Sequence, residues 1–482
     1  MAQKPPPLKT LDFGHLDAAS EAIEEPRLLI EGFYDYKGAA SGIATGQNWL
    51  LLGPKGSGKS AALEHLRLLW KSYPDSFFDY WDLRSFPVND VTSIQMGQSA
   101  GASRAQSAWE FLLLLRIIRS IDLDNGKSAP RSFSELFTEL SRAGLLQSDW
   151  RANVAKWSKS AFKVDLKVVG VESERVVREY SPLELVAAMK AIVAGVSTES
   201  RHVVALDGLD SFFFETEDEW SSLSGLMYAI SSINQFMRTH ELRISVVAAV
   251  RSDIYDVLPG GDLNKLKPYS ATLDWSAQGI GSANHLWTLL NSKVAVRHPE
   301  VRDVVKTYLA APVAIWPHRE LTEYLLDYTR LLPRDLIALM GYVQRAYGGT
   351  SLVPESSAKE AVRRYSEEYF VGEVLDNLAG VLGADRAREL ASFRDVMRTL
   401  PTRTFKFDDV VSELEGELDR REVKLLLKQM FDTGAIGIRN SSGKHKDYFD
   451  FVFRKVSGAG FTIRHTFLLH NALALAWNRP RA

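Results

Sequence analysis

The sequence predicts an α/β fold: a core built on a parallel sheet, then a helical lid, then a C-terminal winged-helix domain. Three observations support this. A glycine-rich loop lies between an apolar run and a helical apolar pattern, two later apolar runs end in charged residues, and helical spacing replaces strand patterns in the second half of the chain. We expect an N-terminal arm over 1–45, the core over 46–280 with an insertion over 125–180, the lid over 281–395 and the winged helix over 396–482.

The glycine-rich loop matches G-x-x-x-x-G-K-[ST], the phosphate-binding P-loop. An apolar run over 49–52 predicts a buried strand before it, and apolar spacing over 61–70 predicts a helix after it. A chance glycine turn would lack these flanks. We expect Lys59 to reach the β- and γ-phosphates of ATP and the Ser60 hydroxyl to ligate Mg²⁺. The predicted nucleotide-binding set of the loop is Gly53, Pro54, Lys55, Gly56, Ser57, Gly58, Lys59, Ser60 and Ala61.

Two further apolar runs supply the charged partners of a P-loop. The run over 203–206 ends in Asp207, as suits a central parallel strand whose last residue points into a nucleotide cleft. We expect Asp207 to be the Walker B carboxylate that holds Mg²⁺, although Asp-Gly is also a common turn pair. The run over 243–250 delivers Arg251 at its carboxyl end, placed to sense a γ-phosphate or to pair with Asp207 or Asp210. A surface arginine at a strand end is the alternative.

Weaker patterns complete the core. Runs over 77–83 and 272–275 predict a second and a last core strand, and apolar spacing over 104–121 and 183–193 predicts helices. Strict alternation over 163–169 predicts an exposed edge strand within the insertion.

Composition is typical of a soluble, cytoplasmic ATPase. The chain has 482 residues, enough for two to four domains, and a net charge of -2, so no global field draws it to nucleic acid. It has no cysteine, which excludes disulfides, thiolate metal sites and cysteine nucleophiles. No run approaches the ~20 apolar residues that span a bilayer, and we expect no membrane segment.

The predicted lid contains a second candidate nucleotide contact. Pro333 opens a helix with an apolar face behind it. Such a helix start would bring Arg334 to the phosphates as a second sensor, with Pro333 near the base. A helix start with a solvated arginine is the alternative.

The C-terminal region has the outline of a winged helix. We expect a strand at 405–407, a helix capped by Asp408 and running to about 418, a second helix over 420–432, and a hairpin of strands over 435–438 and 448–453. Residues 403–481 hold 14 Lys and Arg against 10 Asp and Glu. Candidate phosphate contacts are Arg420, Arg421, Lys424, Lys428, Lys444 and Lys446. Acidic residues interleave with these bases, so protein docking is the alternative.

Several motifs together resemble a group of bacterial P-loop ATPases, which is similar to the STAND and KAP NTPases and more distantly to the origin-recognition branch of the AAA+ proteins. They are FG-x-x-DA at 13–18, KGSGKSA at 55–61, LDGLD at 206–210, RSDIY at 251–255, NKL at 264–266 with LDW at 273–275, and PRDL at 333–336. The resemblance implies an ASCE-type core, ATP as the nucleotide, Arg251 as a sensor and switch-like use of hydrolysis. Relatives in these groups are often linked to phage defence or signalling.

One departure bears on catalysis. AAA+ proteins usually place a glutamate directly after the Walker B aspartate, but Gly208 stands here and the nearest acid is Asp210. Either Asp210 orients the attacking water or hydrolysis is slow, since misplacement of a base lowers the rate steeply.

Two functions follow from these expectations. The first is an ATP-binding, slowly hydrolysing switch or assembly ATPase that acts as a homo-oligomer or on a partner protein. The second is a DNA-binding ATPase, a loader or regulator, that uses the winged helix on duplex DNA. A small-molecule kinase is weaker, because no separate acceptor site is visible.

Overall fold

The computed structural model spans residues 1–482 and describes 4–84, 91, 101–146, 162–164, 178–180, 182–209, 217–277, 279–315, 317–383, 386–440, 448–454 and 460–478. The chain forms two compact units, each with its own packing. We call residues 35–53 and 59–273 the sheet unit, and residues 1–34, 54–58 and 274–482 the lid unit. The P-loop residues 54–58 thus belong to the lid unit, while the strand and helix that flank them belong to the sheet unit.

The sheet unit is built on five strands in the order β2-β5-β6-β1-β7, all parallel. They are β1 (Leu50–Gly53), β2 (Ser76–Asp82), β5 (Arg201–Asp207), β6 (Ile244–Arg251) and β7 (Ser270–Thr272). Every residue of β6 is buried, because helices cover both faces of a parallel sheet. The α/β fold with a parallel core sheet is therefore confirmed.

The last core strand was predicted slightly too late in the chain. It lies at Ser270–Thr272, not at 272–275, because these three residues pair with Leu50–Leu52 of β1. Leu273 still donates its backbone N–H to the carbonyl of Leu52 at 2.8 Å, and strand pairing ends there.

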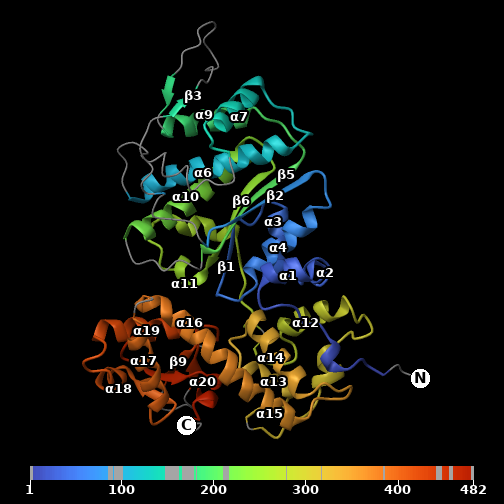
Figure 1. Ribbon diagram of the computed structural model, residues 1–482, viewed down its shortest axis with the longest axis vertical. Helices are drawn as coiled ribbons and strands as arrows, with labels where there is room; N and C mark the ends of the chain where they lie inside the picture. The colour runs from blue at the N-terminus through green and yellow to red at the C-terminus, as the bar shows by residue number, and fades with distance from the viewer. Residues whose placement is uncertain are drawn as a thin grey trace. The chain divides into compact units, whose positions relative to one another are not determined.

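The helices of the sheet unit cover both faces of the sheet. They are α3 (Ala39–Ala44), α4 (Lys59–Trp70), α6 (Gly101–Leu123), α7 (Arg131–Arg142), α9 (Pro182–Ala194), α10 (Glu217–Thr239) and α11 (Ser252–Tyr255), with short 3-10 turns at Tyr36–Gly38 and Leu263–Tyr269. In Figure 1, α6 and α10 lie on one side of the sheet and α3 and α4 on the other. The predicted helices over 61–70, 104–121 and 183–193 correspond to α4, α6 and α9.

A separate two-stranded antiparallel sheet joins β3 (Phe162–Val164) to β4 (Arg178–Tyr180). The edge strand predicted over 163–169 coincides with β3 at Lys163 and Val164, and its remaining residues lie outside the described part of the chain.

The first part of the lid unit is helical. It contains η1 (Leu8–Thr10), α1 (Ala18–Glu24), α2 (Pro26–Ile30), α12 (His285–Ala295), α13 (Leu321–Asp327), α14 (Pro333–Ala346), α15 (Glu355–Arg364) and α16 (Val371–Leu382), with π-helical turns at Val305–Leu309 and Tyr365–Phe370. The N-terminal arm is held against these helices: Gln344 donates through Nε2 to the carbonyls of Leu8 and Leu11 at 2.9 and 2.7 Å.

The C-terminal part of the lid unit is a small α/β domain. It consists of α17 (Ala387–Thr399), β8 (Thr404–Lys406), α18 (Phe407–Glu413), α19 (Arg420–Asp432), β9 (Ile436–Asn440), β10 (Tyr448–Asp450), β11 (Thr466–Leu469) and α20 (Asn471–Ala476). Its sheet is antiparallel, in the order β10-β9-β11-β8. The predicted pairing of the two hairpin strands and the bounds of the helix over 420–432 are confirmed.

This domain differs from the prediction in strand bounds, in its first helix and in an additional strand. Strand β8 spans 404–406 and not 405–407, and β10 ends at Asp450 and not at 453. The first helix begins at Phe407 and ends at Glu413, so Asp408 lies in its first turn and does not cap it; the carboxylate of Asp409 accepts from the Lys406 backbone N–H at 2.8 Å instead. The sequence also gave no sign of β11, which pairs with both β9 and β8. A four-residue strand is too short to show a clear period.

No helix in the described part of the chain is both long enough and apolar enough to cross a bilayer.

Candidate nucleotide-binding site

The P-loop joins β1 to α4, as the motif predicts. Gly56 and Gly58 have φ angles of +84° and +97°, which side-chain-bearing residues rarely adopt, so the loop needs glycine at both positions. Lys59 is the first residue of α4, and its buried ammonium group donates to the carbonyl of Gly53 at 3.1 Å. The lysine is therefore folded back along its own loop, close to the backbone that surrounds an anion in this motif.

An unpartnered polar atom inside the loop fits an anion-binding role. The Ser57 hydroxyl is buried and has no hydrogen-bond partner among the described residues. The Ser57 backbone is held firmly, because its carbonyl accepts from the Trp275 indole N–H at 2.9 Å. Buried hydroxyls are nearly always hydrogen-bonded, so an oxyanion in the loop would satisfy a group that the protein leaves unpaired.

Asp207 ends β5 and is oriented by two donors. The Tyr80 hydroxyl donates to its Oδ2 at 2.7 Å, and the Gly208 backbone N–H donates to its Oδ1 at 2.8 Å. Burial first, and the negative charge of Asp207 second, raise the pKa of Tyr80 well above its usual value, so the phenol stays protonated and donates. The carboxylate is thus fixed in direction, as a Mg²⁺ ligand needs to be.

Glu64 on α4 is a second buried carboxylate of the sheet unit. Burial raises its pKa, the adjacent Arg67 lowers it, and the charge of Asp207 raises it further. The Arg67 Nε lies 2.5 Å from Glu64 Oε2. Sequence reasoning missed both Tyr80 and Glu64, because neither belongs to a spaced motif.

Arg251 ends β6, in register with Gly53 of β1. Its guanidinium is buried and donates to both carboxylate oxygens of Asp253, at 3.0 and 2.5 Å. Asp210, the predicted water-orienting acid, lies outside the described residues. A contact of either residue with a γ-phosphate stays a prediction.

Within the lid unit, the start of α14 lies against the P-loop. Pro333 is in the first turn of α14, and the Arg334 backbone N–H donates to the Gly56 carbonyl at 3.4 Å. The side-chain carbons of Arg334 pack over Gly56, so closely that an added Cβ there would lie 3.2 Å from Arg334 Cβ. Its Nε donates to the carbonyl of Leu16 at 3.0 Å. The predicted second sensor therefore neighbours the phosphate loop, and its contact with phosphate remains to be tested.

The acids of the N-terminal arm have structural partners. Asp17 caps α1 by accepting from the Ser20 N–H at 2.9 Å, and Glu21 forms a buried ion pair with Lys293. If Asp210 is only a turn residue, these two acids are the next candidates for a catalytic base, but their contacts favour a role in packing the arm.

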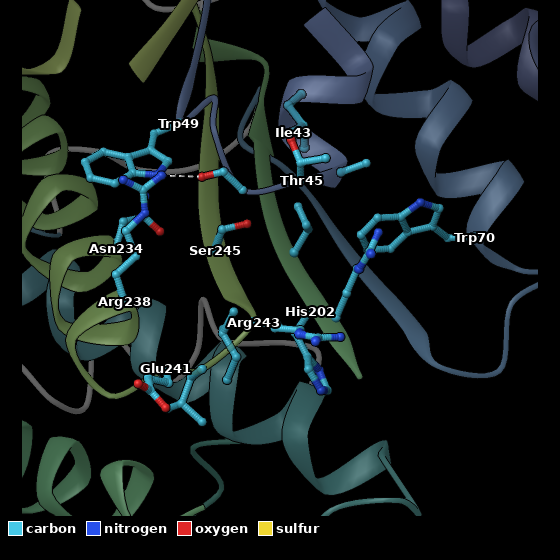
Figure 2. Close-up of a pocket in the computed structure, with 16 residues that line it drawn as sticks. Ile43, Thr45, Trp49, Trp70, His202, Asn234, Arg238, Glu241, Arg243 and Ser245 are labelled. Carbon is cyan, nitrogen blue, oxygen red and sulfur yellow. Dashed lines mark hydrogen bonds between the residues drawn. The ribbon is translucent and has the colours of Figure 1, made fainter. Parts of the chain in front are cut away.

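The sheet unit also contains a cavity of about 490 Å³ that sequence reasoning did not anticipate. Figure 2 shows it between Trp49, Asn234 and Arg238 on one side and Trp70 on the other, with Ser245 of β6 between them. Its strand residues come from the amino ends of β5 and β6, whereas Asp207 and Arg251 lie at the carboxyl ends. Because ligands of open parallel sheets bind beyond the carboxyl ends, this cavity is distinct from the candidate nucleotide site.

The described residues include no group of three or more His, Asp or Glu side chains arranged to hold a metal ion. A P-loop magnesium site does not require one, since a hydroxyl, one carboxylate and the phosphates share the ion.

No protein-family model and no curated protein matches the chain. Among solved structures the chain is similar to the crystal structure of Cdc6p from Pyrobaculum aerophilum, with 12% sequence identity, a TM-score of 0.33, and coverage of 94% of this chain and 97% of that chain.

Proposed function

We propose that this protein binds ATP with Mg²⁺ and hydrolyses it slowly, as a molecular switch or assembly ATPase of the AAA+ and STAND type. The observation that carries the proposal is the P-loop between β1 and α4, with its two left-handed glycines, in a parallel sheet whose strand β5 ends in the oriented carboxylate of Asp207. Strand β6 lies between β1 and β5, which is the arrangement of the ASCE class that the sequence resembles.

The residues of the loop would divide the work of nucleotide binding. Lys59 would bind the β- and γ-phosphates, and Ser60 and Asp207 would hold Mg²⁺. Bound Mg²⁺ supplies neutralisation of the phosphate charge. The buried, unpartnered Ser57 hydroxyl and the backbone N–H groups of Lys55, Gly56 and Gly58 would complete the anion site.

Contacts within the lid unit support a switch. The P-loop touches α14 through Arg334 and approaches α16, where Lys55 Nζ donates to Asn377 Oδ1 at 3.5 Å. Helix α16 packs on α19 of the C-terminal domain. Loss of the γ-phosphate would change the partners of Lys55 and Arg334, and both lie at the start of this chain of contacts. Bacterial defence or signalling is the setting that the sequence resemblance suggests.

The C-terminal domain is best interpreted as a winged helix, with α17, α18 and α19 followed by antiparallel strands. A DNA-binding ATPase is the alternative function. Two of the candidate phosphate contacts are already paired, Arg420 with Asp408 at 2.7 Å and Lys428 with Asp432, while Lys444 and Lys446 lie outside the described residues. This pairing favours a protein-docking role for α19 over DNA binding.

The test of ATP binding is Lys59→Ala, measured by titration calorimetry with Mg-ATP. Removal of the ammonium group should weaken binding by about 10- to 100-fold, the value of one or two charge-assisted contacts. The exposed Lys265, paired only at the surface with Asp262, provides a matched control, and Lys265→Ala should bind like the parent. Parent-like affinity in Lys59→Ala would exclude the P-loop assignment.

Binding to duplex DNA at low and physiological salt, with and without ATP, separates the two functions.

A further inference from the structure

The carboxyl end of β2 brings a second carboxylate beside the Walker B strand. Strands β2 and β5 are parallel neighbours, and their register pairs Asp82 with Asp207. Adjacent strands lie about 4.8 Å apart, so both acids stand at the same edge of the sheet. Asp82 is therefore next to the predicted Mg²⁺ ligand, although 125 residues separate them in the chain.

The geometry of Gly208 explains why no side chain follows Asp207. Gly208 has a φ of +84°, which disfavours any residue with a Cβ. A Cβ built there would lie 2.8 Å from Asp82 Oδ1 and 2.7 Å from Arg84 Cγ. The Asp82 carboxylate thus already occupies the space that a side chain at position 208 would enter.

Arg84 holds this carboxylate in place. The Arg84 Nε lies 3.0 and 2.9 Å from the two Asp82 oxygens, its Nη2 donates to Oδ2 at 2.6 Å, and its backbone N–H donates to Oδ1 at 2.9 Å. Burial raises the pKa of Asp82, but the hydrogen bonds from Arg84 outweigh it and hold the pKa below its usual value. Asp82 is therefore ionised at neutral pH and can accept hydrogen bonds.

The other two carboxylates described nearby, Asp207 and Glu64, already have other partners. Asp207 accepts from Tyr80 and from the Gly208 backbone, and it is the candidate Mg²⁺ ligand. Glu64 is 5% exposed in its side chain and paired with Arg67, whereas the Asp82 side chain is 39% exposed and can be reached by water.

We propose that Asp82, whose carboxylate occupies the space that a side chain at position 208 would enter, is the catalytic residue that orients the attacking water. This inference rests on the proposed ATPase function. The water oxygen bonds to the γ-phosphorus as the bond to the β–γ bridging oxygen breaks, and ADP leaves with the electron pair. Asp82 accepts the hydrogen bond of the water and takes its proton, which then passes to the phosphate product or to solvent.

The test compares Asp82→Asn with the parent in single-turnover hydrolysis, and in Mg-ATP binding by calorimetry. Hydrolysis should fall by about 100-fold, the usual contribution of such a group, while affinity stays within about threefold. The purified variant should retain bound ATP where the parent holds ADP, which reports hydrolysis without a kinetic assay, and the affinity measurement is the readout independent of turnover. Asp82→Glu keeps the charge and should recover part of the rate. Asp75→Asn, at the residue directly before the opposite end of the same strand, is the matched control and should hydrolyse like the parent.

Three outcomes would overturn the proposal: parent-rate hydrolysis by Asp82→Asn, loss of its Mg-ATP affinity along with turnover, or loss of turnover in Asp210→Asn alone. The second outcome would make Asp82 a metal ligand or a structural residue, and the third would return the role to Asp210. Failure of the proposed function itself is distinguishable, because the parent protein would then bind no ATP or would bind it without turnover. Measurements on the parent alone would show this before any variant is compared.

Discussion

At the scale of single residues, the site depends on how side chains outside the motifs orient those inside them. Tyr80 lies two residues before the end of β2 and donates to Asp207 from the neighbouring strand. Its hydroxyl stays protonated because burial and the nearby carboxylate raise its pKa. It therefore fixes one oxygen of Asp207 and leaves the other to the Gly208 N–H and to a metal ion.

Tyr80→Phe removes this hydrogen bond and little else. We expect the Mg²⁺ concentration for half-maximal ATP binding to rise several-fold, because the carboxylate loses a hydrogen bond that orients it toward the metal ion. The free energy of unfolding should fall by about 1 kcal/mol. A calorimetric Mg²⁺ titration at fixed ATP measures the first effect and urea unfolding the second. An unchanged Mg²⁺ dependence would show that Tyr80 serves packing alone.

At the scale of elements, the central strand β6 is longer than its partner β1. The pairing of β1 with β6 begins at Leu50 and Ala248, so Val246 lies before the start of the ladder on that side. Asn234 of α10 fills the gap: its Nδ2 donates to the Val246 carbonyl and its Oδ1 accepts from the Val246 N–H, both at 2.8 Å. A buried side-chain amide thus replaces one residue of the missing strand.

Asn234→Leu keeps the branched shape of the side chain but leaves the Val246 N–H and carbonyl buried and unpaired. We expect a loss of about 2–4 kcal/mol in the free energy of unfolding, since each unsatisfied group costs about 1–3 kcal/mol. The neighbouring Gln235 is exposed on the same helix, and Gln235→Ala should change stability by less than about 0.5 kcal/mol. Denaturant unfolding of both variants checks this, and equal stabilities would contradict the assignment of Asn234 as a ladder substitute.

At the scale of the whole molecule, each unit contains a buried neutral histidine. In the lid unit, burial lowers the pKa of His470 to about 3. The positive charges of Arg454, Arg403 and Arg330 lower this pKa further, and the negative charge of Asp327 opposes the shift. Its Nδ1 accepts from the Ala472 N–H at 3.2 Å while Nε2 faces the Thr329 carbonyl at 3.3 Å, which fits the neutral ring. In the sheet unit, burial lowers the pKa of His202 to about 4, against the opposing charge of Asp124.

Because both histidines are neutral in the folded state, we expect the protein to lose stability in acid. Between pH 6.5 and the folded pKa, the unfolded state binds more protons than the folded state, so stability falls as the pH falls. Each histidine contributes a slope of about 1.4 kcal/mol per pH unit in that range. His470→Asn keeps an acceptor for the Ala472 N–H and should flatten the fall of the unfolding midpoint between pH 6.5 and 5. His240→Asn, at an exposed site, should leave the fall of the unfolding midpoint unchanged. An equal dependence of the midpoint on pH in both variants would contradict the prediction.

The sequence by itself determined the parts that depend on local pattern. The P-loop, Asp207 at the end of its strand, and the helix over 420–432 follow from residue spacing and hydrophobic period, because a turn, a strand or a helix is specified by residues close together in the chain. The edge strand β7 was misplaced by two residues, since its ends depend on the length of its partner β1.

Only the tertiary structure decided which side chains meet. Asp82 stands in the space beside Gly208 because the strand order places β2 next to β5, and no local pattern encodes that order. Arg334 contacts Gly56, which lies 278 positions earlier in the chain. Strand β11, which the sequence did not predict, pairs with both β9 and β8 in the C-terminal sheet. These contacts depend on long-range packing, in which burial of apolar surface by the whole unit selects the neighbours that a short stretch of sequence cannot specify.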